Sequence, residues 1–119
     1  MRLKDYFNKN FQTSDRNAID TLRTHYYYGR MEQVTEGVCS VLKKDGCVIR
    51  YLDLERHEIS FDHREYQGVA TLCASSFTEI ACDFNILTFN ILPTAKGKKV
   101  IERLYEKLDN ELQLKKVGK

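Results

Sequence analysis

The period-two alternation of residues 78–89 constrains the fold more than any other feature of this sequence. Polar or small residues separate the apolar positions Ile80, Cys82, Phe84 and Ile86. Successive side chains of a β-strand point to opposite faces of its sheet, so this pattern predicts a strand with one buried face. A buried face needs a second layer to cover it, and the rest of the chain must supply that layer.

Four other segments also have strand character. Residues 57–63 alternate in the same way, and short polar turns around Asp53–Arg56 and Gln67–Gly68 separate neighbouring strands. Such turns join antiparallel partners, so we expect the last four strands to form a meander. The remaining expected strands are residues 22–28, 47–54 and 69–76.

Two segments have helical periodicity and can form the covering layer. Residues 31–45 place an apolar stripe on one side and are followed by Gly46, a residue favoured just past a helix end. Residues 95–114 carry a longer stripe that includes Leu104 and Leu108. Each helix has one apolar stripe, so we expect both on the same face of the sheet.

These elements predict an α+β fold, a two-layer sandwich in which two long helices cover one face of a mostly antiparallel sheet of about five strands. Near-helical spacing of apolar residues at the start of the chain adds a short first helix. The expected order is (α)-β-α-β-β-β-β-α. We expect a single domain over residues 1–119, with an N-terminal helical segment (1–21), an α+β core (22–114) and a frayed tail (115–119).

The stretch from His25 to Leu112 resembles small uncharacterised bacterial domains with a β-α-β4-α order. The residues that carry the resemblance are the tyrosines Tyr26–Tyr28 near the first strand, the helix end Leu42–Gly46, and Val48 in the strand that follows. The resemblance implies the fold described above. It implies no catalytic residue.

Composition narrows the classes of function. The net charge of +2 comes from 19 basic and 17 acidic residues in 119, so we do not expect nucleic-acid binding. No run of about 20 apolar residues is present, so we expect no membrane span. The first eleven residues lack the apolar stretch of a signal peptide, which predicts a cytoplasmic location.

In a reducing compartment the cysteines are expected to be free thiols, namely Cys39, Cys47, Cys73 and Cys82.

Motifs for common chemistries are missing from the sequence. It contains no nucleophile elbow, phosphate-binding loop, dinucleotide fingerprint or zinc-protease motif. The cysteine and histidine spacings do not match those of zinc sites, so we expect no metal and no cofactor. If the chain is an enzyme, His57 or His63 is the expected base, because each lies among carboxylates.

Three functions remain, in order of preference. The first is a non-enzymatic cytosolic protein-interaction module that binds a second copy of itself or another protein. The second is a small-ligand carrier with a pocket between sheet and helices, and the third is the histidine-based enzyme. The module is expected to use a mixed polar and apolar second sheet face, with Phe7, Phe11, Val48, Leu52, Leu72 and Leu87; the carrier pocket is expected to be lined by Tyr26, Tyr28, Tyr51 and Tyr105.

Overall fold

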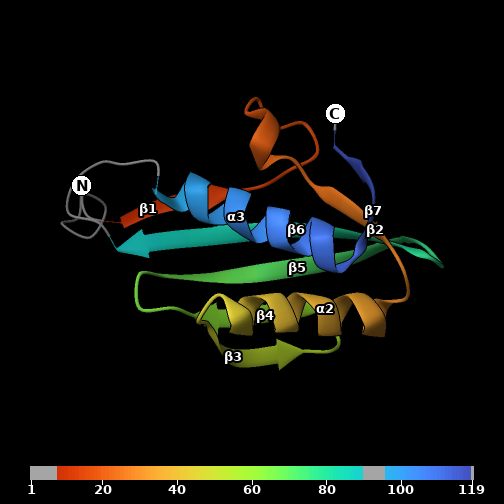
Figure 1. The fold of residues 1–119 in the computed structure, drawn as a ribbon, viewed down its shortest axis with the longest axis horizontal. Helices are drawn as coiled ribbons and strands as arrows, with labels where there is room; N and C mark the ends of the chain where they lie inside the picture. Colours follow the sequence, from red (N-terminus) through yellow and green to blue (C-terminus); the bar gives the residue numbers. More distant parts are fainter. Residues whose placement is uncertain (1–7, 90–95, 119) are drawn as a thin grey trace.

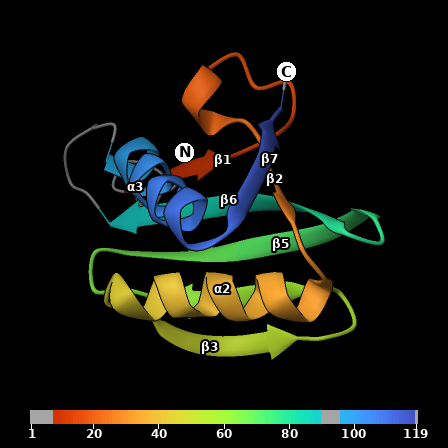
Figure 2. The ribbon, with the colours of Figure 1, turned by 45° about the vertical axis from the view of Figure 1, so that its right-hand side comes forward.

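Two α-helices lie on one face of a seven-stranded antiparallel sheet, as seen in a computed structural model that describes residues 8–89 and 96–118 (Figure 1). Figure 2 shows the two helices side by side over that face. The helices are α2 (Met31–Lys44) and α3 (Lys96–Glu111), and the short 3-10 helix η1 spans Asp20–Leu22. The strands are β1 (Asn8–Gln12), β2 (His25–Tyr28), β3 (Val48–Asp53), β4 (Glu58–Asp62), β5 (Tyr66–Ser76), β6 (Glu79–Phe89) and β7 (Gln113–Val117).

The long strand β6 organises the sheet. The strand order is β3-β4-β5-β6-β2-β7, and β1 pairs with β6 as well. Strands β1 and β2 share the same edge of β6: β2 pairs with residues 79–82 and β1 pairs with residues 85–89. This arrangement leaves β3 at one end of the sheet and β7 at the other.

The end of α2 follows from local sequence. Gly46 adopts φ +96°, a left-handed conformation that a glycine adopts without steric cost. The backbone N–H of Gly46 donates to the carbonyl of Lys43, and the N–H of Cys47 donates to the carbonyl of Leu42. These two bonds form a Schellman motif, which satisfies carbonyl groups that the helix end leaves free. The expected helix over residues 31–45 and its glycine stop are confirmed.

The core lies between the helices and the sheet. Leu104 and Leu108 of α3 are fully buried in one cluster with Ile59, Phe61 and Phe84 of the sheet, as expected. The buried residues of β6 are the alternating set predicted from the sequence, extended at its end by Thr88. Neither helix in the described residues is long and apolar enough to cross a membrane.

Two expectations about the ends of the chain are wrong, and both raise the strand number from about five to seven. Residues 8–12 form strand β1 instead of part of a helix; residues 1–7, including Phe7, lie outside the described residues. The second long helix ends at residue 111 instead of 114, and residues 113–117 form β7, which pairs with β2, instead of a helix end and a frayed tail. Both strands form because a neighbouring strand, β6 for β1 and β2 for β7, offers backbone groups to pair with, a cause that their own composition does not reveal.

The expected composition of the second sheet face also needs correction. In β5 the buried residues are Tyr66, Gly68, Ala70 and Leu72, so Ala70 and Leu72 face the helices and not the open side. Leu52 also faces the helix side, because its register partner is the buried Ile59. We call the opposite, uncovered side of the sheet the open face.

Candidate functional site

The four tyrosines expected to line a carrier pocket lie apart from one another. Tyr105 is buried beneath α3, where its hydroxyl donates to the carbonyl of Cys82 at 2.6 Å. The Tyr26 hydroxyl donates to the carboxylate of Asp15. This hydrogen bond, burial and the negative charge of Asp15 raise the pKa of Tyr26 to about 12. Tyr28 and Tyr51 are exposed on β2 and β3. The structure therefore does not bring the four side chains together.

Two other tyrosines fill the space between helices and sheet. Tyr27 and Tyr66 are fully buried in the core. The hydroxyl of Tyr27 donates to Asp109 at 2.7 Å, and the hydroxyl of Tyr66 donates to Asp45 at 2.5 Å. Burial is the main cause that raises the pKa of both phenols, so both remain protonated donors near neutral pH.

His63 lies in a polar cluster at the end of α2, together with Tyr66 and Asp45. Its ring stacks on Tyr66 with 4.3 Å between centroids. Its Nδ1 accepts the backbone N–H of Glu65, which leaves the proton on Nε2 to donate to the carbonyl of Asp45 at 3.1 Å. Both ring nitrogens thus bind backbone groups, an arrangement that orients the ring and occupies the lone pair a general base would use.

His57 lies apart from this polar cluster. It sits in the exposed turn between β3 and β4 with φ 55°, and its carbonyl accepts the N–H of Leu72. The two histidines proposed as alternative bases therefore lie in two different turns, His57 between β3 and β4 and His63 between β4 and β5, where His63 contacts the end of α2.

A partly buried pair formed by His25 and Asp109 has no local signal in the sequence. Nδ1 of His25 lies 2.9 Å from Oδ1 of Asp109, and its ring stacks on Tyr105 with 3.6 Å between centroids. The pair joins residues 84 positions apart in the sequence. Only the packing of α3 on β2 brings them together, so no local motif marks them. The contacts of His25 with Asp109 and Tyr105 join α3 to β2.

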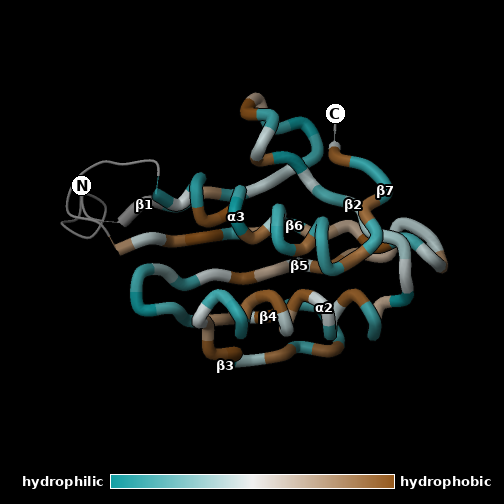
Figure 3. Tube along the Cα trace, in the orientation of Figure 1, coloured by the Kyte–Doolittle hydropathy of each residue, from teal (hydrophilic) through white to brown (hydrophobic). Residues whose placement is uncertain are grey.

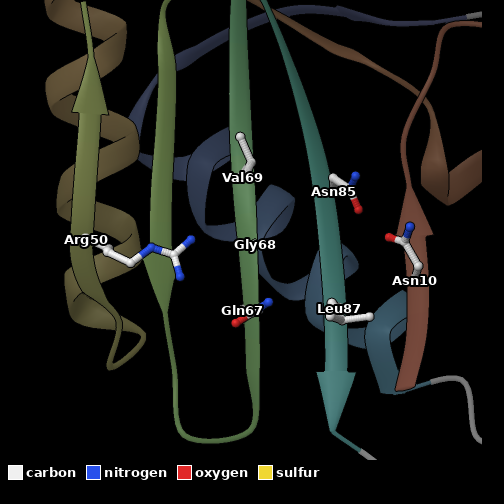
Figure 4. Close-up of a pocket in the computed structure, with 7 residues that line it drawn as sticks. All are labelled: Asn10, Arg50, Gln67, Gly68, Val69, Asn85 and Leu87. Atoms are coloured by element: carbon white, nitrogen blue, oxygen red, sulfur yellow. The ribbon is translucent and has the colours of Figure 1, made fainter. Parts of the chain in front are cut away.

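A shallow hollow lies on the open face (Figure 4). Its volume is about 220 Å³. Pockets that bind small molecules usually have about 300–1,000 Å³ and enclose most of the ligand. This hollow is smaller than that and lies on the open face, so it is not the expected pocket between sheet and helices. Open hollows of about 330–440 Å³ lie elsewhere on the surface, and none of the four expected tyrosines lines them. The residues that line the hollow in Figure 4 are Asn10, Arg50, Gln67, Gly68, Val69, Asn85 and Leu87.

Exposed apolar side chains concentrate on the edge strand β3 and the turn after it. Of nine large hydrophobic side chains exposed in the described residues, four lie within residues 48–54. Val48, Tyr51 and Leu54 are 69%, 62% and 71% exposed, and Leu52 is exposed as well. Figure 3 shows hydrophobic residues, in brown, along this edge of the sheet. We call Val48, Tyr51, Leu52 and Leu54 the β3 edge cluster.

A β-bulge at Arg50 sets which way the side chains of β3 point. Ile49 pairs with Phe61 and Tyr51 pairs with Ser60, so Arg50 is an extra residue without a partner of its own on β4. The guanidinium of Arg50 donates to Asp62 at 3.0 Å and extends over the open face (Figure 4). Arg50 and Tyr51 are therefore neighbours on the same face.

The six residues expected to form an interaction surface also separate. Val48 and Leu52 belong to the β3 edge cluster, although they point to opposite sides of the sheet. Leu87 lines the hollow, and Leu72 is buried. Phe11 packs against the core, where its ring fills the space beside Gly97 of α3. Phe7 lies outside the described residues.

No model of a known protein family matches the chain, and no curated protein matches it either. The resemblance to small bacterial domains therefore remains a prediction.

Proposed function

We propose that this chain is a protein-interaction module that accepts a partner strand along β3. The observation that carries the proposal is the β3 edge cluster. Single exposed apolar residues are common on protein surfaces and need no explanation, but here four lie within residues 48–54, on both sides of one edge strand and in the turn after it. This group lies on β3, whose outer backbone groups have no neighbouring strand among residues 8–89 and 96–118. Edge strands of this kind pair with added strands in many complexes.

The opposite edge of the sheet, strand β7, differs from β3 in its charge. Strand β7 carries Lys115 and Lys116, and charged side chains, lysine above all, discourage pairing at a sheet edge. Strand β3 has one basic residue, Arg50, where β7 has two; Arg50 is paired with Asp62 and Lys115 with Glu79, each within the same sheet. The charge that would protect the β3 edge is therefore directed over the open face and not outward.

Photo-crosslinking in native cells tests the proposal. A photoreactive amino acid replaces Tyr51 in one variant and Phe77 in a control; Phe77 is 85% exposed at the turn between β5 and β6, far from the β3 edge cluster in sequence. We expect a discrete adduct from position 51 and none from position 77. No adduct at position 51, or equal adducts at both positions, would overturn the proposal.

A further inference from the structure

We propose that the partner strand is β3 of a second copy, paired antiparallel about a two-fold axis that passes between Arg50 and Tyr51. This inference rests on the proposed function and names its partner. The two seven-stranded sheets then join into one continuous sheet across the new pair of edge strands.

Side-chain direction is the first argument. Two side chains that face each other across an antiparallel pair lie on the same side of the sheet. Strand β3 has six residues, so full overlap about its centre pairs each even-numbered residue with an odd-numbered one. In a regular strand such partners point to opposite faces, and the pairing fails.

The bulge at Arg50 removes this conflict. Val48 and Asp53 both lie on the open face, because their partners on β4 are Asp62 and Glu58. Ile49 and Leu52 both lie on the helix side, opposite Phe61 and Ile59. Arg50 and Tyr51 share the open face because of the bulge. The two-fold axis therefore places residues of one copy opposite residues of the other, with both members of each pair on the same face. The pairs are Val48 with Asp53, Ile49 with Leu52 and Arg50 with Tyr51.

The chemistry of these pairs is the second argument. Ile49 is half-buried and packs against the core, so Leu52 of the second copy extends that apolar surface. The guanidinium of Arg50 stays on Asp62 of its own chain, and the aliphatic stem of Arg50 lies beside the exposed ring of Tyr51 of the second copy on the open face. Symmetry makes each contact occur twice. All these residues have their partner in an identical strand, so no second kind of protein is required.

Charge is the third argument. Strand β3 carries one positive residue, Arg50, and one negative residue, Asp53, so two copies do not repel each other. Two β7 strands would instead bring four lysines together. The strand is short, and interfaces below about 1,200 Å² are typical of weak complexes. The dimer should therefore form and dissociate with concentration.

Sedimentation equilibrium of the full chain over a concentration series tests the inference. We expect the mass to rise from 14.0 kDa toward twice that value. Tyr51→Lys sets a cation against Arg50 of the second copy twice and should lower the association constant by about tenfold or more, since like charges directly opposite are destabilising. Tyr51→Glu sets an anion there and should keep the association constant within about threefold of the unchanged chain.

Phe77→Lys and Phe77→Glu are the matched controls and should leave association unchanged. Tyr51 is mostly exposed, so its variants should fold, and thermal melting checks this. A chain that stays monomeric at every concentration would overturn the second copy as partner. Equal weakening by Tyr51→Lys and Tyr51→Glu, or no effect of either, would overturn the register. A crosslink from position 51 to a different protein would keep the proposed function and reject this partner.

Discussion

Asp45 and Arg103 form a two-point ion pair between the end of α2 and the middle of α3. Nε and Nη2 of Arg103 donate to the two carboxylate oxygens of Asp45 at 2.9 Å each, across 58 residues of sequence. Lys107 donates to Oδ1 of the same carboxylate at 2.9 Å. The Asp45 side chain is 5% exposed, whereas both cations are more than 40% exposed. A carboxylate that is nearly buried therefore joins the two helices.

Asp45→Asn should lower the free energy of unfolding by about 1–3 kcal/mol, because it weakens charge-assisted hydrogen bonds at a buried group. Chemical denaturation at pH 7 measures the change. Glu111→Gln is the control, because the exposed Lys44–Glu111 pair joins the same helices and should contribute about 0–1 kcal/mol. Equal effects of the two variants would contradict the special role of Asp45.

The contribution of Asp45 should also depend on pH. Burial raises the pKa of Asp45, but hydrogen bonds from Arg103, Tyr66 and Lys107 outweigh burial and hold the pKa below its ordinary value. A carboxyl with a lowered folded-state pKa stabilises the fold above its unfolded pKa of about 4, and loses that contribution as pH falls toward the folded value. The stability difference between the unchanged chain and Asp45→Asn should be constant from about pH 5 to pH 8 and shrink below about pH 4. A difference that grows in acid would contradict this.

Leu104→Ala should lower the free energy of unfolding by about 2–5 kcal/mol, the usual effect of truncating a buried leucine. Leu104 is fully buried in α3. Thermal melting measures the loss, and Glu106→Ala, on the exposed side of the same helix, should change the melting temperature little. A melting temperature that Leu104→Ala leaves unchanged would mean that the helix presents another side to the sheet.

Thiol titration should separate the four free cysteines by exposure. Cys73 is exposed on β5, whereas Cys47 and Cys82 are buried and Cys39 is half-buried. Burial raises the pKa of the last three thiols, so they form little thiolate. We expect one fast-reacting thiol in the folded chain and four in denaturant. Cys73→Ser should abolish the fast phase. Stoichiometric zinc in the purified protein would contradict the expectation of free thiols.

Removal of residues 1–12 should lower the stability of the remaining chain. It deletes β1, which pairs with residues 85–89 of β6, and it removes the Phe11 ring that lies beside Gly97. Thermal melting and gel filtration measure the outcome, and we expect a lower melting temperature with increased aggregation at the uncovered edge of β6. Phe11→Ala isolates the contribution of the ring. A truncated chain with unchanged melting temperature would show that β1 contributes little.

The sequence by itself determined the elements whose causes are local. Alternation marked β4 and β6, and apolar stripes marked α2 and α3, because a strand or a helix must present one side to a core. Gly46 marked the end of α2, because the left-handed residue of a Schellman motif acts within one turn of the chain. For these elements the residues that decide the structure are neighbours in sequence.

Only the tertiary structure decided the features that depend on distant partners. In β5 both faces carry small or apolar residues, so periodicity could not tell whether Val69 or Ala70 faces the helices; pairing of Ala70 with the buried Phe84 decided it. The bulge at Arg50 turned Leu52 away from the open face, and pairing with β6 and β2 made strands of β1 and β7. The contact of Asp45 with Arg103 likewise exists only because α2 packs on α3. Backbone hydrogen bonds and buried charges are satisfied by whichever groups the fold brings near, and sequence distance does not limit that choice.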